Sequence, residues 1–224
     1  MQLRYLSAGL TLAAFLTAPV SADDGKWTVL FDGKNTDQWQ DYKGGPVKDA
    51  WAVQDGSLTL TKGGGGNIAT KKQYSDFEFA FEWKVSPGGN SGIIYLSRPG
   101  DNAPYMSGPE YQILDDDKHR DGKNPKTSAG ALYALIAADG KKLNDVGEWN
   151  TGRIVKRGKH LEHWVNGKKV VETTLHTDKW NKMVAESKFS KWSQFGKSAK
   201  GHIVLQDHGD QIWYRNMKIR ELSE

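Results

Sequence analysis

Alternation of apolar and polar side chains is the clearest pattern in this chain, and it predicts β-strands. Between Phe77 and Val85, aromatic residues occupy every second position, and Glu78 and Glu82 stand between them. Successive side chains of a strand point to opposite faces, so this segment predicts one apolar and one polar face. Further short strands are expected at residues 27–31, 51–53, 57–60, 91–97, 110–114, 131–136, 153–156, 160–165, 168–173, 202–208 and 212–220.

Turn residues separate these segments. Asp55-Gly56 and Asn166-Gly167 each stand between two expected strands, and both dipeptides are strong signals for a two-residue hairpin. Residues 180–191 are the one segment with a helical pattern, and it is weak. Ten or more short strands, Gly-rich turns and no internal repeat or linker predict a single all-β domain folded as a sandwich.

The last expected strand changes phase along its length. Ile212 and Tyr214 alternate as apolar positions, whereas Met217 and Ile219 continue the alternation one residue out of step. One extra residue in the strand would return both pairs to the same face. The pattern therefore predicts a β-bulge near Asn216.

The N-terminal segment has the features of a secretory signal. Arg4 precedes an uncharged apolar run that ends at Thr17, and small residues lead to Ala22 before the acidic Asp23. We expect cleavage after Ala22, which divides the chain into a signal peptide at 1–22 and a mature domain at 23–224. No second hydrophobic stretch follows, so the expectation is an exported, periplasmic or extracellular protein without membrane attachment.

Composition narrows the function classes. The 224 residues contain no cysteine, and 31 basic against 27 acidic residues give a net charge of +4. So small an excess over the whole chain does not indicate a nucleic-acid partner. The nine Trp residues hint at carbohydrate binding, because flat indole faces suit sugar rings. An exported chain without disulfides must be stabilised by its core alone.

Two expected strands carry rows of polar side chains. Glu110 and Gln112 share one face of the segment 110–114, and Gln206 and His208 share one face of the segment 202–208. Periodicity alone leaves two interpretations open, a solvated outer face or a binding face. In the second case, all four side chains should lie on one concave surface, with Asn90 and Ser91 as a polar lip.

Other titratable residues have less specific patterns. Asp115 and His119 belong to an oxygen-rich loop that would suit a divalent metal ion, although runs of Asp are commonly solvated. His163 is expected to be a packed core residue. The spacing of Glu110, Gln112 and Asp115 is that of laminarinase-type glycosidases, but the amide of Gln112 stands where those enzymes need a second carboxylate.

The sequence resembles a known family, the 3-keto-disaccharide hydrolase domain family, across nearly the whole mature chain. The order and spacing of many short motifs carry the resemblance. They include Leu30–Asn35 with Trp39, Asp55–Leu58, Tyr74–Glu78, Asn90–Ile93, Glu110–Asp115, His119, Gly130–Tyr133, Glu148–Asn150, Glu162–Gly167, Ser187–Phe189, Gly201–Gly209 and Arg215-Asn216. Arg120 and Thr151-Gly152 depart from the family's pattern, which bears on substrate preference more than on fold.

The resemblance implies a fold and a substrate class. The fold would be a jelly-roll β-sandwich of the concanavalin or laminin-G type, with two antiparallel sheets. The substrates would be glycosides or disaccharides oxidised at C3, whose ketone acidifies the C2 proton and permits β-elimination of the C1 oxygen, with hydration giving net hydrolysis. A separate oxidoreductase would have to supply this substrate.

The same resemblance suggests roles for the polar residues. Glu110 and His208 would form the acid–base pair. The expected substrate-binding residues are Asn90, Ser91, Gln112, Tyr133, Trp149, Asn150 and Gln206. A metal at the enolate, held by residues such as Asp115 or His119, would serve as a stabiliser.

Two rival functions remain. A non-catalytic carbohydrate-binding jelly roll would need aromatic and amide side chains but no titratable pair. An ordinary laminarinase-type glycosidase would need two carboxylates and is disfavoured by Gln112.

Overall fold

The structure, a computed structural model, describes residues 25–223, so the expected signal peptide at 1–22 lies outside the described residues. The strands are β1 (Thr28–Phe31), β2 (Trp39–Asp41), β3 (Trp51–Gln54), β4 (Ser57–Leu60), β5 (Ile68–Thr70), β6 (Phe77–Val85), β7 (Asn90–Ser97), β8 (Glu110–Leu114), β9 (Asn150–Arg157), β10 (His160–Val165), β11 (Lys168–Thr174), β12 (His202–Leu205) and β13 (Ile212–Glu221). The helical segments are α1 (Asp178–Ala185) and three short 3₁₀ helices, η1 (Pro104–Met106), η2 (Arg120–Lys123) and η3 (Lys188–Lys191).

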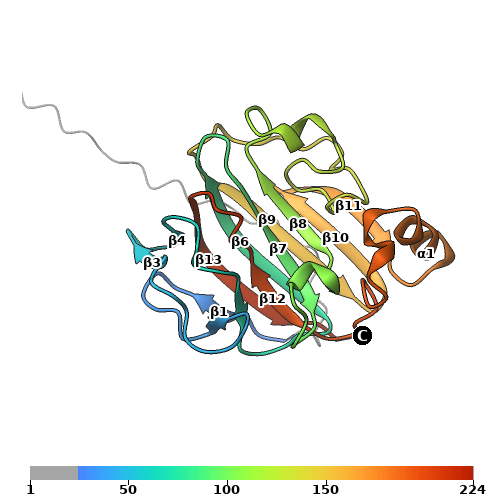
Figure 1. Cartoon of the computed structure of the whole chain (residues 1–224), viewed down its shortest axis with the longest axis horizontal. Coiled ribbons are helices and arrows are strands. Elements are labelled where there is room, and N and C mark those ends of the chain that lie inside the picture. The colour runs from blue at the N-terminus through green and yellow to red at the C-terminus, as the bar shows by residue number, and fades with distance from the viewer. Residues whose placement is uncertain (1–24, 224) are drawn as a thin grey trace, which may run out of the picture.

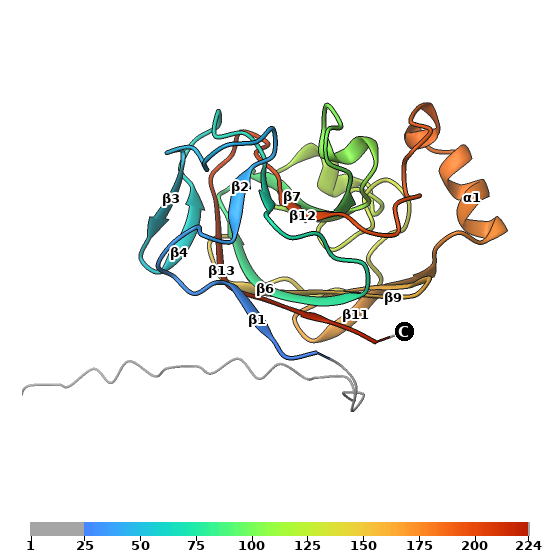
Figure 2. The ribbon, with the colours of Figure 1, turned by 90° about the horizontal axis from the view of Figure 1, so that it is seen from below.

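Two antiparallel sheets pack face to face, as expected for a β-sandwich. The eight-stranded sheet has the order β11-β10-β9-β6-β13-β4-β3, with β1 also paired to β13, and the five-stranded sheet has the order β2-β5-β12-β7-β8. Figure 1 shows β7, β8 and β12 in front of the larger sheet, and Figure 2 shows the two layers from the side. The fold prediction of a single all-β sandwich domain is confirmed.

The core lies between the inner faces of the sheets. Phe77, Phe79, Phe81 and Trp83 on β6 are all buried, as their alternation predicts. They meet apolar side chains of the smaller sheet, and the Phe81 and Tyr111 rings are in edge contact, with centroids 5.3 Å apart. The inner side of β8 therefore belongs to the core, and Glu110 and Gln112 point to the opposite side.

Ion pairs fill the outer face of the larger sheet. Glu78 is 3% exposed and accepts hydrogen bonds from Arg153 and Arg220, although the alternation of β6 predicts only that it faces outward. The Trp164 ring covers Arg153, with 3.9 Å between the guanidinium carbon and the ring centroid. These charges are buried because each carboxylate has cationic partners and an aromatic ring shields them from water.

Turn geometry follows the sequence signals at the hairpins. Asp55, Gly56, Asn166 and Gly167 all have positive φ, as a type I′ turn requires. The segment 131–136, in contrast, is not the expected strand. Ala134 has φ of +58°, and Leu132 pairs with Ile136 in an isolated bridge, so the chain folds back on itself there.

The weak helical pattern at 180–191 corresponds to two short elements. Helix α1 begins after Thr177, whose hydroxyl accepts a hydrogen bond from the Trp180 N–H, and η3 begins after Ser187 in the same manner. No helix within residues 25–223 has both the length and the apolar character needed to cross a membrane.

The predicted bulge in β13 is confirmed. The pairing of β13 with β6 shifts register between Arg215 and Lys218, and Asn216 has φ of +51°. Tyr214 and Met217 are consequently both buried on the inner face. The Asn216 side-chain amide donates to Glu82 at 2.7 Å, which ties the bulge to the neighbouring strand.

We predict that Asn216→Val destabilises the protein by about 2–5 kcal/mol. A β-branched residue in the left-handed region costs about 1–2 kcal/mol, and the lost hydrogen bond to buried Glu82 costs about 1–3 kcal/mol. Asn216→Gly loses the same hydrogen bond but tolerates the backbone angle, so it should be clearly less destabilised. Denaturant unfolding measures both, and equal losses would contradict the strain argument.

Candidate active site

A pocket of about 330 Å³ opens on the outer face of the five-stranded sheet. Its floor and one side are polar, and its opposite side is aromatic and cationic. The lining residues are Asn90, Tyr105, Glu110, Gln112, Tyr133, Lys188, Phe189, Lys191, Trp192, Gln206 and His208. The predicted shared face of Glu110, Gln112, Gln206 and His208 is thereby confirmed, since all four line one pocket.

Glu110 is the only carboxylate among the described residues that line this pocket. It is the first residue of β8 and is 6% exposed. Burial raises its pKa to about 8, the positive charge of Lys188 opposes this rise, and the negative charge of Asp121 adds to it. A carboxyl group with a pKa near neutrality can both accept and release a proton under ordinary conditions.

The position of Glu110 depends on Gly92. Ile94 pairs with Glu110 across the β7–β8 ladder, and Gly92 pairs with Gln112. The Glu110 carboxyl group lies over Gly92, where an added Cβ would be 2.8 Å from Glu110 Cδ. Real Cβ atoms do not approach so closely, so the sheet accommodates this buried carboxyl group because position 92 has no side chain.

A chain of hydrogen bonds approaches Glu110 from the loop after β8. The Asp121 N–H donates to Nδ1 of His119 at 3.1 Å, so a neutral His119 carries its proton on Nε2. That Nε2 lies 3.4 Å from the Asn90 side-chain amide, which must turn its oxygen toward His119 and its NH₂ toward Gln112. In the matching orientation, Gln112 donates to Glu110 Oε1 at 3.3 Å. The main-chain N–H of Asp121 therefore sets the donor-to-acceptor direction of every hydrogen bond in this series.

His208 and Gln206 follow the end of β12 and are held by a loop from across the sheet. The Asp207 carboxylate between them accepts from the N–H groups of Gly64 (3.0 Å) and Gly66 (2.8 Å). The exposed His208 has its Nε2 3.5 Å from the same Asn90 side-chain amide atom that faces His119. The buried Oε1 of Gln206 has no hydrogen-bond partner among the described residues.

Tyr133 is the last of the predicted site residues that line the pocket. Its hydroxyl group donates to Asp121 at 3.3 Å, and burial raises its pKa to about 12, with the charges of Asp121 and Glu110 adding to the rise. The sharp turn at 131–136, which replaces the expected strand, brings Tyr133 to this position.

Three predicted substrate-binding residues lie outside the pocket. Ser91 points to the other side of β7, where its hydroxyl donates to the Gln206 carbonyl at 2.7 Å. Trp149 lies 4.0 Å from the Arg215 guanidinium, on the outer face of the larger sheet. Asn150 Oδ1 accepts from the Asn144 N–H and the Asn166 amide, so it anchors a loop. Trp149 and Asn150 lie at the larger sheet, whereas the pocket lies on the smaller one. Membership of the same set of sequence motifs therefore does not imply a shared face.

The donors at Asp115 and His119 do not fit the expected metal site. Both Asp115 oxygens accept main-chain N–H groups, one from Gly88 at 2.6 Å and the other from Asp117 and Lys118. His119 uses its Nδ1 lone pair for Asp121 and carries a proton on Nε2. Asp115 is therefore a loop anchor, and His119 belongs to the hydrogen-bond chain described above.

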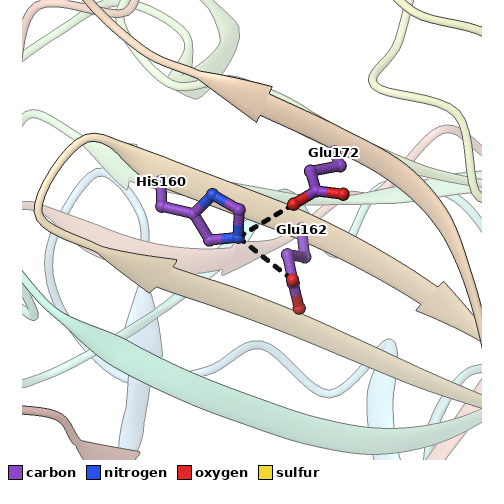
Figure 3. Close-up of side chains that lie close together, drawn as sticks. All are labelled: His160, Glu162 and Glu172. Atoms are coloured by element: carbon purple, nitrogen blue, oxygen red, sulfur yellow. Dashed lines mark hydrogen bonds and ion pairs between the residues drawn. The ribbon is translucent and has the colours of Figure 1, made fainter.

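Within residues 25–223, one other group has metal-like spacing. The ligand atoms of His160, Glu162 and Glu172 lie within 4.8 Å of one another, on the outer side of β10 and β11. His160 Nε2 is 3.0 Å from Glu162 and 3.6 Å from Glu172 (Figure 3). The Lys169 ammonium, however, contacts both carboxylates, at 3.2 and 2.6 Å. Lys169 therefore already pairs with both carboxylates, and the arrangement is an ion-pair network.

His163 is a core residue, as expected. Its Nδ1 donates to the Gly130 carbonyl at 3.1 Å, and its Nε2 accepts from the Tyr95 hydroxyl at 2.8 Å. Burial lowers its pKa to about 4, which keeps the ring neutral.

Sequence periodicity did not reveal one side of the pocket. Tyr105, Phe189 and Trp192 form what we call the aromatic wall, in which the Tyr105 and Trp192 rings have centroids 5.3 Å apart. Lys188 and Lys191 accompany it. These residues come from the irregular segments around η1 and η3, where no alternation reports which way a side chain points. The Ser187–Phe189 motif was the one available signal.

Comparisons with known proteins show the family of this chain. The family model described as "3-keto-alpha-glucoside-1,2-lyase-like domain" matches residues 26–220. A 3-keto-disaccharide hydrolase from Bacteroides thetaiotaomicron (strain ATCC 29148) is 34% identical over 239 residues, which cover 93% of this chain and 82% of that protein. The crystal structure of a candidate glycosyl hydrolase from Parabacteroides distasonis ATCC 8503 is 33% identical, with a TM-score of 0.83 over 89% of this chain and 94% of its own.

A more distant likeness concerns the fold alone. The catalytic domain of an endo-1,3-beta-glucanase (laminarinase) from Thermotoga petrophila RKU-1 is 12% identical, with a TM-score of 0.52 over 89% of this chain and 100% of its own. The two-sheet architecture is therefore shared with a glycosidase fold.

We predict that Glu110→Gln changes how stability depends on pH. The folded state holds a proton on Glu110 up to about pH 8, whereas an ordinary carboxyl group loses it near its model value of 4.5. The contribution of this proton to stability is thus complete below pH 4.5 and is lost as the pH rises through about 8. Over that window, Glu110→Gln should gain stability relative to wild type by up to about 1.4 kcal/mol per pH unit. Denaturant unfolding at several pH values tests this, and a flat difference would contradict the raised pKa.

Proposed function

The chain belongs to the 3-keto-alpha-glucoside-1,2-lyase-like family, and we propose that it cleaves the glycosidic bond of 3-keto-glycosides by elimination. The named hydrolase relative supports the substrate class. The observation that carries the mechanism is that Glu110 is the single carboxyl group among the described residues lining the pocket, and that its burial raises its pKa to about 8. An ordinary glycosidase needs two carboxylates across the scissile bond.

The ketone at C3 explains how one carboxylate can suffice. It acidifies the C2 proton, because the electron pair left behind delocalises onto the C3 oxygen as an enolate. When the enolate reverts to the ketone, the C1–oxygen bond breaks and a C1=C2 double bond forms. The leaving oxygen takes up a proton and departs as an alcohol. The other product is a 3-keto-2-hydroxyglucal, to which water can add across C1=C2 to complete a net hydrolysis.

We assign the C2 proton to Glu110. Its low-dielectric surroundings make the carboxylate a stronger base than one in water, and the hydrogen bond from Gln112 orients it. Because the base must be ionised, kcat/KM should fall as the pH drops below about 8. We assign His208, at the exposed side of the pocket, to the leaving oxygen as general acid.

Other groups in the pocket suit a sugar. The side-chain amide of Gln206, which lines the pocket, would form a hydrogen bond with a hydroxyl group. The aromatic wall offers apolar faces on which a second ring can pack. Since elimination and hydration involve no net redox change, a separate oxidoreductase must introduce the ketone.

Isotope labelling distinguishes the proposed reaction from its rivals. In deuterated water, the enzyme should incorporate deuterium at C2 of recovered 3-keto-glucoside or of the product, and the unoxidised parent glycoside should be inert. Glu110→Gln and His208→Ala should each lower kcat by about a hundredfold or more, while circular dichroism reports an unchanged fold. Cleavage of the parent without label at C2 would support an ordinary glycosidase. Binding without cleavage of either compound would support a carbohydrate-binding module.

Gly92 provides an independent test of where Glu110 must lie. Gly92→Ala should keep the fold but displace the Glu110 carboxyl group, lowering kcat by about tenfold or more, since small errors in the position of a catalytic group are costly. Glu110→Asp shortens the side chain and relieves the clash. The double variant should therefore be no worse than Glu110→Asp alone. Strictly additive losses would show that Gly92 acts in some other way.

A further inference from the structure

The proposed elimination needs a group that stabilises negative charge on the C3 oxygen. Preorganised donors or cations placed where charge develops are commonly the largest catalytic contribution. The amides of Asn90 and Gln112 are committed to the hydrogen-bond chain that ends on Glu110. The cations that line the pocket within residues 25–223 are Lys188 and Lys191, both from η3.

Building on the proposed function, we propose that the Lys188 ammonium binds the C3 oxygen and stabilises the enolate that forms there. Lys188 is exposed as a residue, yet its Nζ lies over the Tyr133 ring, 4.1 Å from the centroid. Tyr133 and Glu110 line the same pocket, so the ammonium is held across from the base. Lys191 lies instead over Trp192, 4.4 Å from its centroid, at the aromatic wall.

The position of Lys188 over an aromatic ring suits its charged form. Burial lowers the pKa of Lys188 and the positive charge of Lys191 adds to this, whereas the negative charges of Glu110 and Asp121 act in the opposite direction. The face of Tyr133 also attracts a cation and not a neutral amine. An ammonium group that donates a hydrogen bond therefore fits this position better than a free amine that would attack the ketone to form an imine.

The charges balance during the reaction. Before proton transfer, the negative charge is on Glu110, whose interaction with Lys188 is already strong enough to affect both pKa values. When Glu110 takes the C2 proton, the carboxyl group becomes neutral and the C3 oxygen becomes negative. Lys188 thus faces one negative charge throughout. The proposal places the C3 oxygen nearer to the Lys188 ammonium than Glu110 is, so the transition state is stabilised more than the ground state.

Substitution of Lys188 tests this role through kcat and the pH profile. Lys188→Met should lower kcat about a hundredfold to a thousandfold, with a smaller change in KM, and should slow C2 deuterium exchange in parallel. Because Lys188 holds down the Glu110 pKa, the acid limb of kcat/KM should also move to higher pH. Lys188→Arg keeps the charge and should recover much of both effects. Lys197→Met, an exposed site on the following loop, is the matched control and should resemble wild type.

The other outcomes overturn the proposal in recognisable ways. A change in KM alone would make Lys188 a binding residue. A fully inactive Lys188→Arg, together with borohydride trapping of substrate on Lys188 of the wild type, would show an imine mechanism instead. Full activity of Lys188→Met with normal C2 exchange would exclude Lys188 but leave the elimination standing. Absence of C2 exchange in the wild type, with cleavage of the unoxidised parent, would reject the proposed function and this role with it.

Discussion

The absence of a side chain at position 92 is the constraint on which the candidate site depends. In a sheet, neighbouring side chains on one face normally crowd one another, and a carboxyl group would be pushed into solvent. Gly92 leaves space on β7 into which Glu110 folds, and the carboxyl group becomes buried there. Burial without an ion-pair partner at contact distance raises the pKa, and the raised pKa makes the group chemically useful.

The buried carboxylates Glu78 and Glu110 have different surroundings on the outer faces of the two sheets: among the described residues, Glu78 is ion-paired on the larger sheet, and Glu110 is not on the smaller one. On the larger sheet, Glu78 is matched by Arg153 and Arg220, so its charge is fixed and supports the structure. On the smaller sheet, Glu110 receives an amide hydrogen bond from Gln112 but has no cation at ion-pair distance among the described residues. A fully paired carboxylate is a poor base, because removing its charge leaves its partners unpaired. The contrast favours the smaller sheet as the place of the candidate site.

Strand periodicity accounts for what the sequence could predict. It placed Phe77 and Glu110 on the correct faces and located the bulge at Asn216, because alternation is a direct consequence of backbone geometry. His208 lines the pocket as expected, but the predicted strand at 202–208 ends at Leu205, so alternation does not explain its position. It could not place Trp149 or Lys188. Trp149 precedes β9, and its motif does not report which sheet that strand joins. Lys188 lies in a 3₁₀ segment, whose packing is decided by contacts distant in sequence.

The ketone and the fold together explain why a glycosidase-like sandwich would differ in its catalytic groups. Where charge develops at C1 and the ring oxygen, two carboxylates on neighbouring strand positions are the suitable pair. Where charge develops on the C3 oxygen, a second carboxylate would repel it, and an amide such as Gln112 is the better neighbour for the base. The compensating cation must then approach from above the sheet. A loop beside the pocket can deliver it, and η3 places Lys188 there without altering any strand.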